Sequence, residues 1–444
     1  MTAASRVRFV TFGCKANQYD TQVLREALLR RGWSEEQGDA DLVVINTCTV
    51  TAEAGRKARQ LARRIHRETP AARIAMTGCL AESEPELLRE LPGVEWVLGN
   101  GDAKRPVNFL RQIGEEVDPE ELGIPSGITA FAGHTRAFLK IQDGCDMRCA
   151  FCIIPSVRGP SRSRPAEELE AELRRLLASG HREVVLCGIH IGHWGRERGS
   201  SLAALLRRLF AIELPGGEDW RLRLSSIEAT EVDDALLAVL AEHGAGDGRV
   251  ALHLHMPLQA GDDELLRAMR RWYDARTYLA ACDRIRDALD RPAFTADVIV
   301  GFPGETDARF ENTLDVVRAA GFARLHVFPW SARPGTAAAG LGGAPDKAVV
   351  RERRVRLSEL AAELGDAWRR GLAGARDAVV LEGWSGLSGR YQQVRVDPAS
   401  WPDAGLPPAV LPVELAVEED ADGGARLVGR PLAGLARRAA EALA

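Results

Sequence analysis

Three closely spaced cysteines constrain what this chain can fold around more than any other feature of its sequence. Cys145, Cys149 and Cys152 follow the spacing C-x3-C-x2-C, and an aromatic residue, Phe151, stands before the third. Thiolate sulfur is a soft ligand that suits iron–sulfur clusters, zinc and cuprous copper. A four-iron cluster normally takes four thiolates, so three of them leave one iron open. Catalytic metal centres keep an open coordination position, and the spacing therefore predicts a catalytic cluster.

A structural zinc site or a disulfide would fit these cysteines less well. A structural zinc site needs a fourth ligand nearby, and the nearest histidines, His134 and His181, do not have the usual ligand spacing. Disulfide bonds belong to oxidising compartments, and the first residues show no signal-peptide pattern. A zinc-dependent RNA-binding protein, which would use the same thiolates without catalysis, is kept as the alternative of another class.

A second set of three cysteines follows three predicted strands near the start of the chain. Apolar runs lead into Cys14, Cys48 and Cys79, and helix-like segments separate them. Such alternation indicates a parallel α/β sheet, and the spacings of 34 and 31 residues (48 − 14 and 79 − 48) match one βαβ unit each. The carboxyl ends of these strands share one rim, where ligands bind. We therefore expect the thiols to converge on a second cluster, the alternative being three unrelated buried cysteines.

The sequence around both sets resembles that of one enzyme family. The strings KIQDGCDMRCAFCIIP, TFGCKANQYDT, NTCTV and TGCLAE are similar to motifs of the methylthiotransferases, which belong to the radical S-adenosylmethionine superfamily. The resemblance implies a [4Fe-4S] cluster on each set, with S-adenosylmethionine chelated by the open iron of the Cys145 set. It also implies that a 5′-deoxyadenosyl radical removes hydrogen from the substrate, and that a methylated sulfur on the second cluster is then transferred.

The first cysteine of the amino-terminal set lies in a string that also resembles one branch of the family. Lys15, Asn17 and Gln18 look like residues of the branch that adds a methylthio group to carbon 2 of N6-threonylcarbamoyladenosine in tRNA. This resemblance implies that the partners are tRNA, through its anticodon loop, and an electron donor such as flavodoxin or ferredoxin. Isopentenyladenosine in tRNA and an aspartate of a ribosomal protein remain alternative acceptors of the same chemistry.

The order of predicted strands and helices indicates an α/β protein in four parts. We expect an amino-terminal parallel-sheet domain (1–120) and a central partial (β/α)6 barrel of the radical S-adenosylmethionine type (130–345). A linking helix (346–374) and a small OB-like β-barrel (375–444), which resembles a TRAM domain in position, complete the chain. The stretch 106–133, which Gly and Pro interrupt, is expected to be a linker.

Polar residues and glycines at the predicted strand ends of the barrel are candidates for binding S-adenosylmethionine. Active sites of βα barrels lie at the carboxyl ends of the strands, and glycine there lets the backbone approach a ligand closely. By the resemblance, the candidate cofactor-binding residues are Phe151, Gly188, Ser226, Glu228, Gln259 and Gly301.

RNA contacts are expected from local basic patches. The formal net charge of −5 excludes a uniformly basic nucleic-acid-binding protein. Arginines follow the cysteine loop in the string VRGPSRSRP, and others share one face of a predicted helix at 52–68. The candidate RNA-binding residues are Arg158, Arg162, Arg164, Arg56 and Arg63, and in the last domain Arg390, Tyr391 and Arg395.

The composition also indicates the cellular compartment in which the protein acts. No apolar span in the sequence reaches the length needed to cross a bilayer. The eight cysteines fit a reducing environment, where such patterns indicate metal binding or catalysis. We therefore expect a cytoplasmic enzyme that does not associate with membranes.

Overall fold

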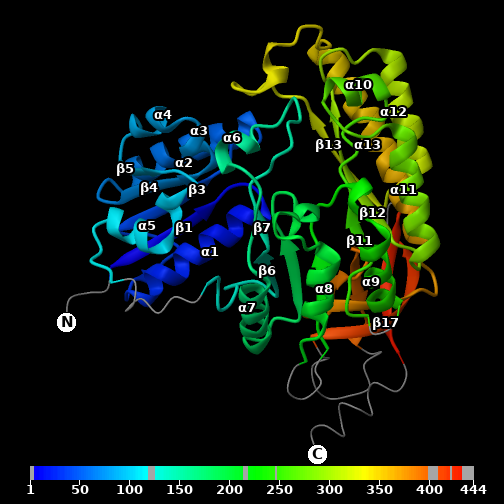
Figure 1. The fold of residues 1–444 in the computed structure, drawn as a ribbon, viewed down its shortest axis with the longest axis horizontal. Helices are drawn as coiled ribbons and strands as arrows, with labels where there is room; N and C mark the ends of the chain where they lie inside the picture. The colour runs from blue at the N-terminus through cyan, green and yellow to red at the C-terminus, as the bar shows by residue number, and fades with distance from the viewer. Residues whose placement is uncertain are drawn as a thin grey trace, which may run out of the picture.

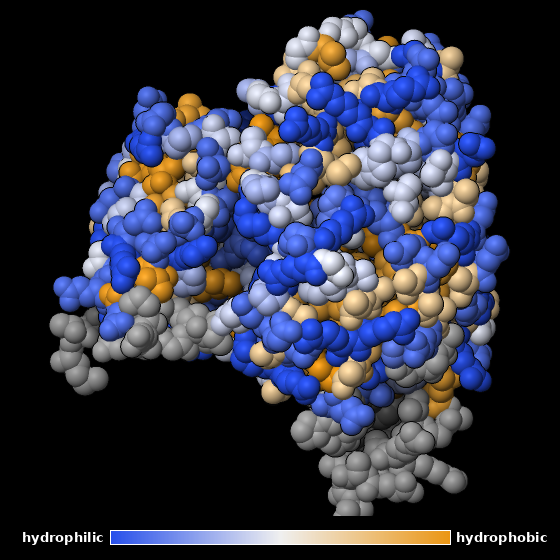
Figure 2. Space-filling view, in the orientation of Figure 1, coloured by the Kyte–Doolittle hydropathy of each residue, from blue (hydrophilic) through white to orange (hydrophobic). Residues whose placement is uncertain are grey.

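A computed structural model of the chain describes residues 5–118, 126–213, 219–245, 248–398, 409–420 and 423–432. Figure 1 shows the first domain, drawn in blue to cyan, beside a larger body that holds the central barrel and the carboxyl-terminal strands. Figure 2 shows the surface of the same face, with a notch between these two lobes. No helix in the described ranges is both long and apolar enough to span a bilayer.

The first domain is a five-stranded sheet in the order β2-β1-β3-β4-β5, and every pairing in it is parallel. Its central strand is buried at every position, which explains the continuous apolar run in its sequence. The strands are β1 (Arg6–Thr11), β2 (Ser34–Glu35), β3 (Leu42–Thr47), β4 (Arg73–Gly78) and β5 (Val94–Leu98). The helices are α1 (Lys15–Arg30), α2 (Ala52–Glu68), α3 (Cys79–Ser83), α4 (Pro85–Arg89) and α5 (Pro106–Gln112).

The prediction that residues 106–133 form a linker is wrong for the first of these residues. Its first residues form α5, and Phe109 and Leu110 there are fully buried in the core that also contains Leu24 and Leu28 of α1. Seven residues are too few for a helical period to stand out among glycines and prolines, so only the packing reveals this helix.

The central domain is a six-stranded open barrel, as predicted. Two parallel sheets, β10-β9-β6 and β11-β12-β13, are joined by bridges between Leu222 and Val250 and between Ser226 and His255. Among the described residues β6 does not pair with β13, so the barrel stays open between its first and last strands. The strands are β6 (Arg136–Lys140), β9 (Glu183–Cys187), β10 (Arg221–Leu224), β11 (His253–His255), β12 (Ala293–Val300) and β13 (Arg324–Pro329).

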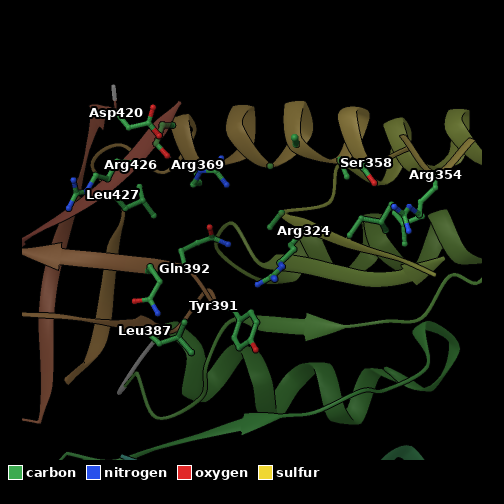
Figure 3. Close-up of a pocket in the computed structure, with 18 of the residues that line it drawn as sticks. Arg324, Arg354, Ser358, Arg369, Leu387, Tyr391, Gln392, Asp420, Arg426 and Leu427 are labelled. Carbon is green, nitrogen blue, oxygen red and sulfur yellow. Dashed lines mark hydrogen bonds between the residues drawn. The ribbon is translucent and has the colours of Figure 1, made fainter. Parts of the chain in front are cut away.

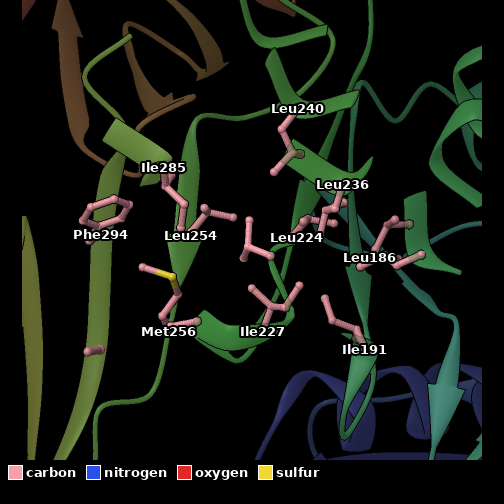
Figure 4. Packing of buried hydrophobic residues seen from close by; sticks show 14 of the residues in the cluster. Leu186, Ile191, Leu224, Ile227, Leu236, Leu240, Leu254, Met256, Ile285 and Phe294 are labelled. Atoms are coloured by element: carbon pink, nitrogen blue, oxygen red, sulfur yellow. The ribbon is translucent and has the colours of Figure 1, made fainter. Parts of the chain in front are cut away.

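Helices cover the outside of the barrel and form its main core with the strands. Figure 4 shows Leu224, Leu254 and Phe294 of the strands against Leu236 and Ile285 of two helices. Each fully buried side chain of this kind contributes roughly 1.5–3 kcal/mol of transfer free energy. The helices are α7 (Ala166–Ala178), α8 (Leu202–Phe210), α9 (Asp234–Ala245), α10 (Asp263–Ala268), α11 (Ala275–Ala288) and α12 (Asp307–Ala320).

A long helix, α13 (Lys347–Arg370), leads to a small closed β-barrel, which confirms the predicted OB-like architecture. Its strands close in the order β14-β15-β16-β18-β17. They are β14 (Arg376–Glu382), β15 (Ser385–Ser388), β16 (Gln393–Val396), β17 (Val410–Glu419) and β18 (Ala425–Pro431).

Buried arginines of the central barrel hold this small barrel in place. Arg221 Nη2 donates to the carbonyl of Leu387 at 2.8 Å, and Arg223 Nη2 donates to the carbonyl of Ser388 at 2.8 Å. The fully buried Glu183 carboxylate pairs with both guanidiniums, at 2.5 and 2.9 Å. Since buried charges need such partners, these contacts fix the carboxyl-terminal barrel against the amino-terminal ends of β9 and β10.

One of the three RNA contacts expected in this last domain is wrong, because Arg390 is not accessible. Arg390 is buried and donates to the backbone carbonyls of Asp290 and Arg291 at 2.8 and 2.9 Å. The Tyr391 ring stacks on His253 with 4.4 Å between the ring centroids. Both side chains therefore anchor the domain, and of the three only Arg395 is exposed.

Candidate active site

The loop that holds Cys145, Cys149 and Cys152 is closed at its base by two short strands. β7 (Gln142–Asp143) pairs antiparallel with β8 (Arg162–Ser163), and the Cys145 amide donates to the carbonyl of Gly159 at 3.0 Å. Between them, after the cysteines, lies the short helix α6 (Ile154–Arg158). This base positions the loop above the carboxyl end of β6.

The three thiols of this loop line a cavity of about 170 Å³. Four of the six predicted cofactor-binding residues line the same cavity, namely Phe151, Ser226, Glu228 and Gln259. Gly188 precedes Ile189, which lines it, and a Cβ at Gly188 would lie 2.9 Å from the Gln142 carbonyl oxygen. Gly301 lies elsewhere, in a hollow beside Val350 of α13, so the structure does not bring it to these cysteines.

Two side chains that the sequence did not assign to the site contact its thiols directly. His190 Nδ1 lies 3.7 Å from Cys145 Sγ, and Arg271 Nη1 donates to Cys149 Sγ at 3.3 Å. Burial lowers the pKa of His190, but its hydrogen bonds with Cys145 and Glu231 outweigh burial and raise that pKa to about 9. Both residues therefore place positive charge beside the sulfur atoms of this loop.

Burial favours the protonated form of two thiols of this loop, Cys149 and Cys152. It raises the pKa of Cys152 to about 12 and also raises the pKa of Cys149, against the opposing charge of Arg271. A thiol must lose its proton to bind a metal. Binding of a metal here is therefore coupled to proton release.

The cysteines of the first domain converge as expected at the carboxyl ends of its strands. Cys14 caps α1, Cys48 follows β3, and Cys79 is the first residue of α3. A Cβ at Gly13 would lie only 2.9 Å from Cys48 Sγ, so glycine is required beside this thiol. Burial and, further, the neighbouring Cys79 and Cys14 raise the pKa of Cys48 to about 11.

A second cavity, of about 230 Å³, lies between the loop of Cys152 and the segment that follows Cys48. Val50 and Thr51, which follow Cys48, line it together with Cys152 of the other loop. Arg333 lies at this junction: it is 9% exposed and its Nε donates to the Val50 carbonyl at 3.2 Å. Its Nη2 is buried without a hydrogen-bond partner among the described residues. The cavity therefore has a cation that is free to bind an additional group.

A buried ionic network holds the two domains together. Asp20 Oδ2 accepts from Lys104 at 3.0 Å and from Arg158 at 3.2 Å, and its other oxygen accepts from Lys140. Although burial opposes ionisation, these three cations hold the pKa of Asp20 far below its usual range. Arg158 also pairs with Asp143 at 2.8 Å.

The candidate RNA-binding arginines differ in their exposure to solvent. The Arg158 side chain is 1% exposed, so the contact expected with RNA phosphates does not fit its position. Arg164 pairs with the buried Glu172 at 2.7 Å and donates to Tyr19 Oη at 2.9 Å, so it also serves the domain interface. Arg162, Arg56 and Arg63 are exposed.

Among the described residues, the six thiols have the ligand chemistry that iron–sulfur clusters need. All six are free cysteines, arranged as two sets of three soft ligands. Two groups without cysteine have ligand atoms within 4.8 Å of one another, but their imidazole and carboxylate ligands suit single ions. These groups are His190, His193 and Glu231, and His255, Asp297 and His326.

Comparison with known proteins decides between the chemistries that such a site allows. The profile described as "Radical SAM superfamily" matches residues 139–317, and "Uncharacterized protein family UPF0004" matches residues 6–99. Threonylcarbamoyladenosine tRNA methylthiotransferase MtaB of Bacillus subtilis (strain 168) is 38% identical over 81% of this chain and 80% of the relative. This chain belongs to the radical S-adenosylmethionine methylthiotransferases. The cofactors of this methylthiotransferase are two [4Fe-4S] clusters and S-adenosylmethionine.

Two further matches describe the extent of this similarity. tRNA-2-methylthio-N(6)-dimethylallyladenosine synthase of Parafrankia sp. (strain EAN1pec) is 39% identical over 84% of this methylthiotransferase and 77% of the relative. The radical S-adenosylmethionine methyltransferase TsrM of Kitasatospora setae shares the fold, with a TM-score of 0.55 and 17% identity over 76% of this chain and 75% of that one. The relatives thus establish the family and the fold, while their names differ in the adenosine that is modified.

Proposed function

We propose that this methylthiotransferase adds a methylthio group to carbon 2 of N6-threonylcarbamoyladenosine in tRNA. The observation that supports this most is the cavity of about 230 Å³ between the loop of Cys152 and the segment that follows Cys48. An adenine in this cavity would lie against Cys152 of the first set and beside Val50 and Thr51, which follow Cys48 of the second. The string around Lys15, Asn17 and Gln18, and the name of the Bacillus subtilis relative, favour the threonylcarbamoyl substituent.

The cysteines have distinct roles in this proposal. Cys145, Cys149 and Cys152 hold the cluster that binds S-adenosylmethionine, and Cys14, Cys48 and Cys79 hold the cluster that provides the sulfur. With its cofactor bound, the first cluster supplies radical chemistry, which can act on an unactivated C–H bond such as that at carbon 2 of adenine. An electron donor such as flavodoxin or ferredoxin, and a cytoplasmic location, belong to the same proposal.

Other side chains position the cofactor and the substrate. Gln259 lines both cavities, and hydrogen bonds of its backbone with Asp297 and Ile299 hold it in a left-handed conformation at φ 65°. Because such a conformation costs free energy in a residue other than glycine, the surrounding structure must impose it. Phe328 and Trp330 give the cavity aromatic surfaces on which a base can stack. Glu228, held by Arg271, offers a carboxylate to the cofactor.

Two tRNA substrates test this assignment directly. The reconstituted enzyme is incubated anaerobically with tRNA that carries either N6-threonylcarbamoyladenosine or N6-dimethylallyladenosine, and the nucleosides are analysed by mass spectrometry. We expect 2-methylthio-N6-threonylcarbamoyladenosine from the first substrate and no methylthio product from the second. Methylthiolation of the dimethylallyl substrate alone would show that the enzyme acts on the other adenosine.

Replacing Arg333 with leucine should reduce methylthiolation by about 10- to 100-fold. The guanidinium fixes the Val50 carbonyl and keeps one unpartnered Nη2 at the cavity, and a hydrogen bond to a charged group contributes about 1.5–3 kcal/mol. Iron content and cleavage of S-adenosylmethionine should remain, because the hydrogen bond of Arg333 goes to a backbone carbonyl and not to a cysteine. Product formation and 5′-deoxyadenosine are measured in the same reaction.

Arg318→Leu is the matched control for this change. Arg318 is exposed on α12 and pairs only with Asp315, three residues away, among the described residues. Its replacement should leave both products unchanged. Equal methylthiolation by the wild type and Arg333→Leu would rule out a role of this cation in the cavity.

A further inference from the structure

A large cleft lies on the side of the molecule where the central barrel is open. It has a volume of about 960 Å³ and is lined by the beginnings of β6 and β13, one face of α13, and strands of the small barrel. Figure 3 shows these parts around it, with the helix along one wall. Five arginines and one carboxylate are among the lining residues: Arg136, Arg324, Arg354, Arg369, Arg426 and Asp420. The charge of the lining is therefore strongly positive.

Three of these arginines have no partner for their charge in the part of the chain that the structure describes. Arg324, Arg354 and Arg426 are exposed, and none of their side chains forms a hydrogen bond or ion pair within the described ranges. The other two are engaged: Arg136 pairs with Glu183 at 3.6 Å, and Arg369 pairs with Asp366 at 3.3 Å. Arginines that pair with nearby carboxylates are common on a solvated surface. Three unpaired ones around a single cleft indicate an anionic ligand.

The shape of the cleft suits an extended anion. Along α13, its lining runs from Arg354 through Ser358 and Gly365 to Arg369, which spans about 22 Å at the helical rise of 1.5 Å per residue. Ala361, Ala362 and Gly365 provide the middle of this wall, so no long side chain fills the space there. A small anion such as free phosphate would reach only one end of this wall.

The cleft is connected to the cavity beside Cys152. A hollow of about 470 Å³ shares Arg354 with the cleft and shares Pro329 and Trp330 with that cavity. The exposed cations Lys347 and Arg351 line the same hollow. The first residues of β13 line the cleft, and its last residues line the cavity. The two are therefore separated by the length of this six-residue strand, about 17 Å. A cationic path therefore leads from the small barrel to the proposed site of chemistry.

We propose that this arginine cleft binds the phosphate backbone of the tRNA substrate, in the part that adjoins the modified anticodon loop. This inference depends on the proposed function only for the identity of the polyanion. The cleft combines residues of the central barrel, α13 and the small barrel, so the surface exists only when these parts are docked. Arg390 and Tyr391 hold the small barrel in this position, and Tyr391 also lines the cleft.

The test is a triple variant, Arg324→Gln, Arg354→Gln and Arg426→Gln, in the full-length holoenzyme. Each phosphate contact contributes about 0.7–0.9 to the slope of log K against log salt. We expect the slope for tRNA binding to fall by about 2–3, and affinity to weaken at least about tenfold at 0.1 M salt. KM for tRNA should rise while kcat, iron content and cleavage of S-adenosylmethionine remain.

A control variant removes the same amount of charge elsewhere. Arg174, Arg207 and Arg276 are exposed on α7, α8 and α11 and do not line the cleft. Their replacement by glutamine should leave the salt slope unchanged. An equal slope for both triple variants would overturn the inference. Normal tRNA binding together with slower reduction by flavodoxin would also overturn it, because the cleft would then bind an acidic electron-transfer protein.

The binding assay separates this inference from the proposed function. If the triple variant loses tRNA affinity while the wild type modifies only dimethylallyladenosine, the cleft stands and the choice of adenosine fails. If the wild type modifies threonylcarbamoyladenosine and the variant binds tRNA normally, the cleft fails and the function stands.

Discussion

Cys48→Ser should abolish methylthiolation and leave cleavage of S-adenosylmethionine intact. Cys48 lies with Cys14 and Cys79 in the first domain, apart from the loop of Cys145. Loss of one of three thiolates should empty that set, so iron should fall from about eight to about four per chain. Mutation of a residue that only hydrogen-bonds to a metal ligand lowers metal affinity or activity by about 10- to 100-fold. Loss of a ligand itself should therefore lower methylthiolation by more than about a hundredfold.

Two companion variants complete this experiment. Cys145→Ser should also retain about four irons, but it should lose both 5′-deoxyadenosine and the methylthio product, because the radical is needed first. Cys282→Ala is the control, since Cys282 is fully buried in α11 and belongs to neither set. It should keep all its iron. Complete loss of iron in Cys48→Ser would show that the two sets do not bind clusters independently.

The cysteines were predictable because the relevant information is local. The spacing of Cys145, Cys149 and Cys152 is visible within one loop, and Cys14, Cys48 and Cys79 each follow an apolar strand. Parallel strands bring their carboxyl ends to one edge, so topology alone places the second set together. The open six-stranded barrel follows from the same alternation of strands and helices.

The partners of these thiols were not predictable, because they come from distant parts of the chain. His190 reaches Cys145 from 45 residues away, and Arg271 reaches Cys149 from 122 residues away. Asn100, whose Nδ2 lies 3.5 Å from Cys79 Sγ, also donates to a carbonyl of α6 across the domain boundary. No periodic pattern marks such a contact, and Arg271 and Asn100 look like ordinary loop residues in the sequence.

The surroundings of the arginines could not be predicted from the sequence either. Arg158 follows a loop and stands in an arginine-rich string, which is typical of a solvated or phosphate-binding segment. Its burial depends on Asp20, 138 positions earlier, which supplies the carboxylate that makes burial tolerable. Conversely, Arg324, Arg354 and Arg426 are far apart in sequence and become one surface only through the docking of the small barrel.

Replacing Asp20 with alanine should lower the free energy of unfolding by about 3–5 kcal/mol, as expected when one partner of a buried ion pair is removed. Lys104, Lys140 and Arg158 would lose the carboxylate that they share. Denaturant unfolding under anaerobic conditions measures this loss. Asp102→Ala is the control, because Asp102 is exposed and pairs only with Arg105 among the described residues, and such surface pairs contribute about 0–1 kcal/mol.

The advantage of the wild type over Asp20→Ala should also depend on pH. Although burial opposes it, nearby cations lower the pKa of Asp20 and lower that of Asp143 to about 2, below the value of about 3.9 in an unfolded chain. Carboxylates with a depressed pKa stabilise the fold fully above the unfolded pKa, because there neither state binds the proton. As the pH falls from about 5 toward 2, the unfolded chain takes up protons first and this stability is lost. The difference between the two proteins should therefore be constant from pH 7 to about 5 and shrink below it, and a difference that stays constant down to pH 3 would show that folding does not lower the pKa of Asp20.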